Sequence, residues 1–167
     1  MSLYHPRDGQ YVKSNAYASV AHRLENYTMG YSAPIFSPTG GVKISAHDLA
    51  VYMMMHMNNG QLNGVRIISE ESAKTMQTPV WTKQNPEEDQ YGLCLYQFID
   101  FIDDERYHQP DLYPVGHEGL AYGLRSIMVW SPADGWGIVA MTNGYTPVEG
   151  KDFIQTLTNA IYKACVK

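Results

Sequence analysis

His117 and Glu118 are the adjacent side chains with the clearest capacity for chemistry, and they stand between two glycines in the sequence GHEGL. Imidazoles and carboxylates are among the groups that most often transfer protons in enzyme sites. A glycine such as Gly119 lets a second group approach the backbone closely. The predicted site residues, at the lip of a cleft, are His117, Glu118, Gly119 and Leu120. The same stretch is also compatible with a simple turn, in which His117 is a hydrogen-bonded residue of a sheet edge.

The chain also contains residues for two other kinds of hydrolytic site. The first is a serine-protease-like triad of Ser126, His117 and Asp134. The second is a pair of carboxylates formed by Glu118 with Asp103 or Asp104. No Gly-x-Ser-x-Gly sequence or other signal places these groups, so both rank below the GHEGL site.

Two apolar runs follow the candidate site and are expected to anchor it. Residues 124–130 and 137–141 are β-rich, and Pro, Asp and Gly occur between them at 131–135. This pattern predicts an antiparallel hairpin. Along the first run the predicted faces are Leu124, Ser126, Met128 and Trp130 on one side and Arg125, Ile127 and Val129 on the other. Neither face is polar throughout, which indicates a central strand covered on both sides.

Three helices are predicted from capping signals and apolar spacing. The first begins after the N-cap Ser45, with Asp48 at its third position, and ends at Asn59 and Gly60. Its predicted apolar face is Leu49, Tyr52, Met53, His56 and Met57. The second begins at Ser69 and ends before Pro79. The third spans about 150–164, with a predicted stripe of Phe153, Leu157, Ile161 and Ala164.

The remaining segments complete an α+β fold, an antiparallel sheet with flanking helices. We expect a hairpin at 4–14, irregular chain at 15–35, a loop at 37–41 and a turn at 63–64 before a short strand at 65–68. A loop at 81–90, a long strand at 91–102 and an exposed loop at 103–114 follow. Residues 1–167 form one domain by length, with Cys94 as a core residue of the long strand.

Composition excludes several kinds of partner. A net charge of −5 argues against nucleic acid, and no apolar run approaches the ~18 residues of a membrane span. Two cysteines make neither a disulfide framework nor a metal site. The run MMMHM at 53–57 contains ligands that suit soft metals, but successive helix positions point in different directions, so we predict core residues and no cofactor. The N-terminus lacks the pattern of a signal peptide.

Three blocks, in order, resemble the serine β-lactamase and penicillin-binding protein superfamily in its class C-like branch. Residues 117–119 are similar to its third motif, Lys-Thr-Gly or His-x-Gly. Residues 37–50 are similar to a Gly-Gly and Asp-Leu-Ala helix start, and residues 59–76 to an Asn-Gly to Met block. The resemblance implies that the chain is the C-terminal portion of a domain of this bacterial superfamily.

The resemblance also implies roles for the candidate residues. His117 takes the place of a cation that binds substrate carboxylates and shares the proton network of a nucleophilic serine. Gly119 leaves room for substrate, and the N–H of Leu120 is one oxyanion donor. Glu118 stands where Thr is usual and should repel a carboxylate. These departures favour esterase or peptidase chemistry over β-lactam hydrolysis.

The superfamily's nucleophile is missing from this sequence. No Ser-x-x-Lys and no Tyr-x-Asn occurs, and Ser72 and Lys74 have the wrong spacing. We therefore expect a fragment that begins after both motifs and is inactive alone, or else a non-catalytic module that binds peptide, peptidoglycan or a partner chain. The complete protein would act on a small-molecule or peptide acyl substrate. The resemblance implies a periplasmic or extracellular location, and an exposed apolar sheet face suggests a homo-oligomer.

Overall fold

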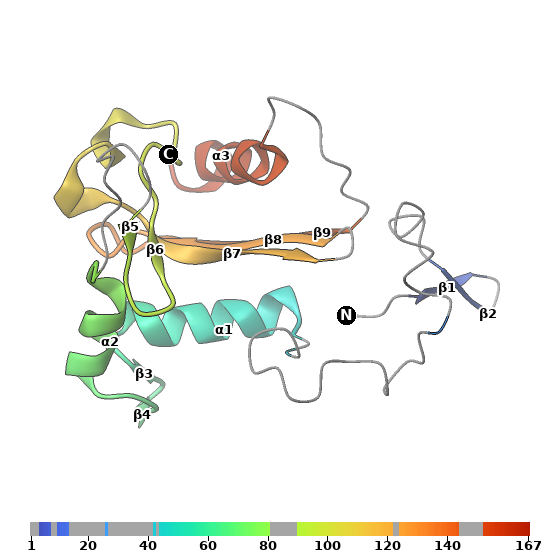
Figure 1. Cartoon of the computed structure of the whole chain (residues 1–167), viewed down its shortest axis with the longest axis horizontal. Helices are drawn as coiled ribbons and strands as arrows, with labels where there is room; N and C mark the ends of the chain where they lie inside the picture. Colours follow the sequence, from blue (N-terminus) through green and yellow to red (C-terminus); the bar gives the residue numbers. More distant parts are fainter. Residues whose placement is uncertain are drawn as a thin grey trace.

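A computed structural model describes residues 4–7, 10–13, 26, 42, 44–80, 90–121, 124–143 and 152–167. A central antiparallel sheet separates two helical layers, with α1 (Ala46–Met57) on one face and α3 (Phe153–Cys165) on the other (Figure 1). The predicted α+β class is confirmed. The predictions for 15–35, apart from Asn26, for 37–41 and for 81–89 of the loop predicted at 81–90 lie outside the described residues.

The main sheet has the strand order β5-β6-β7-β8-β9. Its long strands are β7 (Val115–Ala121), β8 (Leu124–Trp130) and β9 (Gly137–Asn143), and β8 lies between the other two. Met128 and Trp130 contribute to the core beneath α1, whereas Ile127 and Val129 contribute to the core beneath α3. The predicted hairpin and the alternation of a strand covered on both faces are therefore confirmed.

Helix α1 begins and ends where its capping residues predict. Ser45 Oγ accepts a hydrogen bond from the N–H of Asp48 at 3.0 Å, and Asn59 and Gly60 follow the helix with positive φ. A Cβ at Gly137 would lie 2.4 Å from Met53 Cε, so glycine allows the close contact of α1 with β9. The apolar face is partly corrected, because Met55 is buried and Tyr52 is exposed. The buried side chain of Met55 extends the apolar face of α1 to one side of the predicted stripe.

The next segment contains a small hairpin and a short helix. Strands β3 (Gln61–Leu62) and β4 (Val65–Arg66) are joined at Asn63 and Gly64, both with positive φ. Helix α2 (Glu70–Gln77) follows the N-cap Ser69, whose Oγ accepts from the N–H of Ser72 at 3.0 Å. The predicted turn and the predicted second helix are both present.

The prediction of one long strand at 91–102 is wrong. The chain instead forms a tight hairpin of β5 (Gln90–Tyr91) and β6 (Tyr96–Gln97), so only Tyr91, Tyr96 and Gln97 of the predicted range are strand residues. Cys94 has φ 65° at the tip of this hairpin and is exposed, so its assignment to the core is also wrong. Leu95 and Phe98 flank β6 and are buried in two different core clusters, so the apolar run reflects burial and not continuous strand pairing.

The predicted exposed loop at 103–114 contains two short 3-10 helices, Glu105–Tyr107 and Pro110–Leu112. Tyr107 is buried and its hydroxyl donates to Asp134 at 2.6 Å. Trp136 Nε1 donates to the same hydroxyl at 2.6 Å. This segment is therefore fastened to the β8–β9 turn.

The stripe predicted for the last helix is confirmed at Leu157 and Ile161, which pack against the core, and wrong at Phe153 and Ala164, which are exposed. Ile154, Thr158 and Tyr162 are the fully buried side chains of α3, while Phe153 is 44% exposed. Ile154 and Tyr162 belong to the same core cluster as Ile127 and Ile138 of the sheet. Phe153 is the first helical residue and lies at the rim of this contact.

The predicted N-terminal hairpin is present as β1 (Tyr4–Arg7) and β2 (Gln10–Lys13), which pair antiparallel in a separate two-stranded sheet. Within the part of the chain that the structure describes, no helix has the length and apolarity needed to cross a bilayer.

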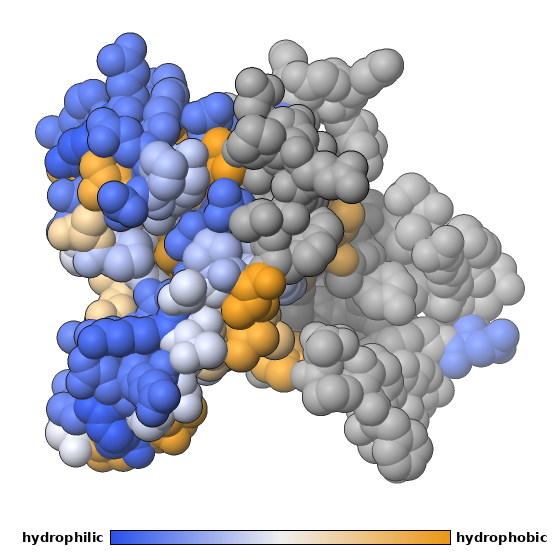
Figure 2. Space-filling view, turned by 60° about the vertical axis from the view of Figure 1, so that its left-hand side comes forward, coloured by the Kyte–Doolittle hydropathy of each residue, from blue (hydrophilic) through white to orange (hydrophobic). Residues whose placement is uncertain are grey.

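The described surface is mostly hydrophilic in Figure 2, with hydrophobic residues gathered near its centre. Large exposed hydrophobic residues include Val51, Met54, Val65, Ile67 and Leu93. The predicted oligomer through an exposed apolar sheet face stays a prediction.

Candidate active site

The GHEGL sequence is part of strand β7, so the interpretation of it as a simple turn is wrong. Strand β6 pairs with the start of β7, where Tyr96 lies opposite Gly116 and the N–H of Phe98 donates to Pro114 O at 2.8 Å. Backbone groups alternate in direction along an antiparallel strand. The N–H and C=O groups of Gly116, Glu118 and Leu120 therefore point toward this same edge. No described strand pairs with the edge beyond Gly116.

The imidazole of His117 lies at this edge of β7. Its Nε2 is 3.1 Å from the hydroxyl oxygen of Tyr91, and its Nδ1 contacts the carbonyl oxygen of Glu118. The second contact agrees with the outward direction of the Glu118 carbonyl. The ring of Tyr96 lies beside the imidazole, with centroids 5.1 Å apart. His117 is thus half-buried among aromatic rings with both nitrogens engaged.

Tyr91 is the neighbour of His117 that sequence reasoning missed. It belongs to β5, 26 residues before His117, and reaches it because β5 folds back along β6. Burial raises the pKa of Tyr91, and the neighbouring Tyr96 and Cys94 add to this effect. The phenol is therefore a neutral hydrogen-bond donor at ordinary pH.

Glu118 belongs to an ion-pair cluster rather than standing alone. Arg125 of β8 lies 3.1 Å from Glu118 Oε2 and 3.2 Å from Asp152 Oδ1. The Arg125 side chain is only 12% exposed, so both pairs are partly shielded from water. Asp152 also caps α3 by accepting from the N–H of Ile154. The cluster joins β7, β8 and the start of α3, and sequence reasoning had not connected these residues.

Gly119 and Leu120 complete the predicted set. Gly119 lies opposite Ser126, and a Cβ built on it would be 2.4 Å from Ser126 Oγ, so the close approach of this hydroxyl requires glycine. The Leu120 side chain is 65% exposed. Its backbone N–H points to the edge where His117 lies. A backbone N–H fixed at an open strand edge is the kind of donor that stabilises a developing oxyanion.

A cavity of about 440 Å³ lies beside these residues. Its described lining is Tyr96, Phe98, Phe101, His117, Glu118, Leu120, Arg125 and Asp152. Three of the four predicted residues therefore line one cavity, and Gly119 lies between them on the same strand. The two carboxylates and the single guanidinium give this wall an excess of one negative charge at neutral pH.

The two alternative sites are not assembled by the described contacts. Asp134 bonds to Tyr107, Arg106 and Ser131 in the β8–β9 turn, at the opposite end of β8 from Ser126. It does not orient His117, whose partners are Tyr91 and the Glu118 carbonyl. The carboxylate pair fails in a similar way, because Glu118 pairs with Arg125 whereas Asp103 pairs with Lys163 and Asp104 accepts from Tyr162.

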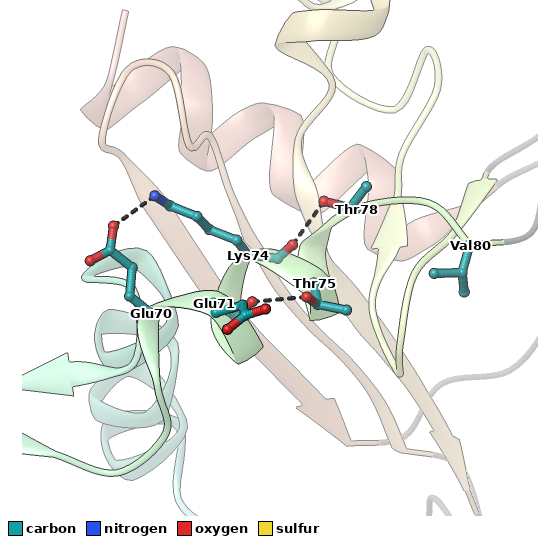
Figure 3. A pocket seen from close by; sticks show the side chains of 6 residues that line it. All are labelled: Glu70, Glu71, Lys74, Thr75, Thr78 and Val80. Carbon is teal, nitrogen blue, oxygen red and sulfur yellow. Dashed lines mark hydrogen bonds and ion pairs between the residues drawn. The ribbon is translucent and has the colours of Figure 1, made fainter.

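A second cavity, of about 580 Å³, lies along α2 (Figure 3). Its polar side chains bond within their own helix: Lys74 to Glu70 at 2.6 Å, and the Thr75 and Thr78 hydroxyls to backbone carbonyls. Ser72 bonds to Ser69 at 2.8 Å and not to Lys74. These contacts support a structural role for α2 and agree with the rejection of Ser72 and Lys74 as a catalytic pair.

The methionine-rich run of α1 holds no metal-type cluster, and neither do the other described residues. His56 is buried between the edge of Tyr52 and the stacked ring of Trp130. Burial lowers the pKa of His56, so the ring is neutral at ordinary pH. It is a core histidine, as predicted, but neither of its buried ring nitrogens has a hydrogen-bond partner among the described residues.

The comparisons with known proteins give the family. The model of the beta-lactamase family matches residues 2–160. The chain therefore belongs to the beta-lactamase family and has the fold of the related serine hydrolases. No curated protein and no solved structure matched it.

Proposed function

We propose that this chain is the C-terminal, acyl-binding part of a serine hydrolase of the beta-lactamase family. Its serine nucleophile would come from a further region of the same protein. The observation that carries the proposal is the edge of β7 beyond Gly116, which no described strand covers and where the Leu120 N–H points outward beside His117. An acyl carbonyl lying along this edge would meet a fixed backbone donor and an imidazole at once.

Each residue of the edge then has a defined task. The N–H of Leu120 is one of the two oxyanion donors, and a donor of this kind contributes roughly 10²- to 10³-fold to the rate. Gly119 keeps the strand surface flat opposite Ser126. His117 belongs to the proton network of the nucleophile.

The charges favour neutral or cationic acyl substrates over carboxylates. Arg125, the cation of the cavity wall, is shared by Glu118 and Asp152. A substrate carboxylate would have to compete with two carboxylates for one guanidinium. Esters and peptides that present a neutral or cationic group to the cavity avoid this competition. The substrate class is therefore an ester or peptide rather than an anionic β-lactam.

The first test is the reading frame that precedes this sequence in the gene. In-frame Ser-x-x-Lys and Tyr-x-Asn sequences are expected there, in that order. Their absence would contradict the proposal and favour a non-catalytic module that binds peptide or peptidoglycan.

The second test is kinetic. The longer protein should hydrolyse a neutral p-nitrophenyl ester faster than a carboxylate-bearing one, and alanine in place of the upstream serine should abolish turnover. The 167-residue chain alone should hydrolyse neither that ester nor nitrocefin. Turnover by this chain that a serine-directed fluorophosphonate abolishes would overturn the assignment of the nucleophile to another region.

A further inference from the structure

Two contacts define the state of the His117 ring. Nδ1 contacts the carbonyl oxygen of Glu118, and Nε2 lies 3.1 Å from the Tyr91 hydroxyl oxygen. A carbonyl oxygen only accepts hydrogen bonds, so Nδ1 carries the hydrogen. In the neutral imidazole Nε2 is then the acceptor, and the hydrogen of that bond comes from Tyr91.

Tyr91 is well placed for this task. Its ring meets Tyr96 edge to face, with centroids 4.3 Å apart at 82°, and Tyr96 is also beside the imidazole. The hairpin that carries Tyr91 is held to the sheet through the pairing of β6 with β7. The hydroxyl is thus fixed by packing and strand pairing, and it remains protonated because burial raises the pKa of Tyr91.

We propose that Tyr91 is a positioning residue of the site, which holds the His117 ring with its hydrogen on Nδ1 and its Nε2 lone pair toward the phenol. The hydrogen-bond assignment is independent of the proposed function, and only its catalytic meaning rests on it. Free histidine does not fix its tautomer; the hydrogen bond made by the other nitrogen does so in proteins.

The consequence concerns what a substrate meets at the edge of β7. Both imidazole nitrogens are engaged, so the ring offers no spare N–H while Tyr91 is in place. The outward N–H of Leu120 is then the donor for an acyl oxygen. A substrate carboxylate finds no unengaged nitrogen on His117. Tyr91 therefore contributes to the choice of substrate without being a catalytic residue itself.

The test is the nitrogen NMR spectrum of the 167-residue chain. Long-range ¹H–¹⁵N correlations of the imidazoles are recorded at pH 8, where histidine is ordinarily neutral. The signals of His117 are those that disappear in His117→Gln. We expect a protonated-type Nδ1 and an unprotonated-type Nε2 that is displaced by a hydrogen bond.

Tyr91→Phe removes only the hydroxyl and should move the Nε2 signal toward the position of an unbonded nitrogen. Tyr113→Phe is the matched control, because it removes a hydroxyl from another half-buried tyrosine, whereas the Tyr96 hydroxyl interacts with Tyr91 itself. It should leave both nitrogen signals of His117 in place. Circular dichroism of each variant checks the fold.

Three results would overturn the proposal: a His117 with its hydrogen on Nε2, a Tyr91→Phe spectrum that matches wild type, or a Tyr113→Phe spectrum that reproduces the Tyr91→Phe change. If Tyr91→Phe does not fold, two wild-type observations test the proposal instead: the tautomer of His117, and a cross-peak between the Tyr91 hydroxyl proton and the His117 ring. A missing upstream nucleophile would refute the hydrolase proposal and leave these spectra unchanged. A wrong tautomer would leave the hydrolase proposal standing.

Discussion

The carboxylate of Asp152, at the N-terminus of α3, lies 3.2 Å from the guanidinium of Arg125 in β8. Asp152 also accepts hydrogen bonds from the N–H groups of Ile154 and Gln155. One carboxylate therefore both begins the C-terminal helix and ties it to the sheet beside the candidate site. Because Arg125 also pairs with Glu118, the position of α3 is coupled to the strand that carries His117.

Two substitutions at Asp152 separate its cap from its charge. Asp152→Asn keeps an oxygen for the helix N–H groups and removes the ion pair, so it should lower the free energy of unfolding by less than about 1 kcal/mol. Asp152→Ala removes both and should cost about 1–2 kcal/mol. Urea unfolding monitored by circular dichroism measures the difference. Equal losses in the two variants would show that the cap contributes nothing.

His117→Ala in the longer protein should lower kcat/KM for a neutral ester by about ten- to a thousand-fold. The melting temperature should fall as well, because the ring packs beside Tyr96 and bonds to Tyr91, so the rate loss is compared at a temperature where both proteins are folded. His117→Lys should shift preference toward carboxylate-bearing esters, and Glu118→Thr should act in the same direction by removing a negative charge. His47→Ala, at an exposed position of α1, is the control. Wild-type rates in all His117 and Glu118 variants would place the site elsewhere.

His56 makes stability depend on pH. Burial lowers the pKa of His56 in the folded chain, so the unfolded chain binds its proton more readily. Stability should be greatest above the ordinary histidine pKa of about 6.5 and should fall as pH drops below it, by up to about 1.4 kcal/mol per pH unit.

Denaturant midpoints between pH 8 and pH 5 measure this dependence. His56→Leu should remove much of the slope, whereas His47→Gln, at a side chain that is 85% exposed, should keep it. A slope that is the same in wild type and His56→Leu would rule out His56 as its origin.

The corrected face of α3 predicts unequal effects at adjacent residues. Ile154 is fully buried, so Ile154→Ala should cost about 2–5 kcal/mol of unfolding free energy. Phe153 is 44% exposed, and Phe153→Ala should cost less, about 1 kcal/mol, although the side chain is larger. Thermal or urea unfolding decides the order. A larger loss at Phe153 would restore the stripe predicted from the sequence.

Local signals in the sequence determined much of the fold. Ser45 and Ser69 set the starts of α1 and α2, because an N-cap acts on backbone groups three residues away. Asn63 and Gly64 form the predicted turn with positive φ. The alternation along residues 124–130 predicted which side chains lie on each face of β8. The GHEGL sequence identified the strand that borders the candidate cavity.

Tertiary structure alone decided what surrounds that strand. Tyr91 reaches His117 across 26 residues, and Arg125 joins Asp152 across 27, so no spacing in the sequence reveals either contact. Cys94 lies in an apolar run but is exposed, because a positive φ turns the chain there. Such contacts depend on how strands pair and how a helix docks. Strand pairing and helix docking join segments that are far apart in the sequence, and alternative pairings of those segments compete in free energy. Caps and turns, in contrast, form their hydrogen bonds within a few residues.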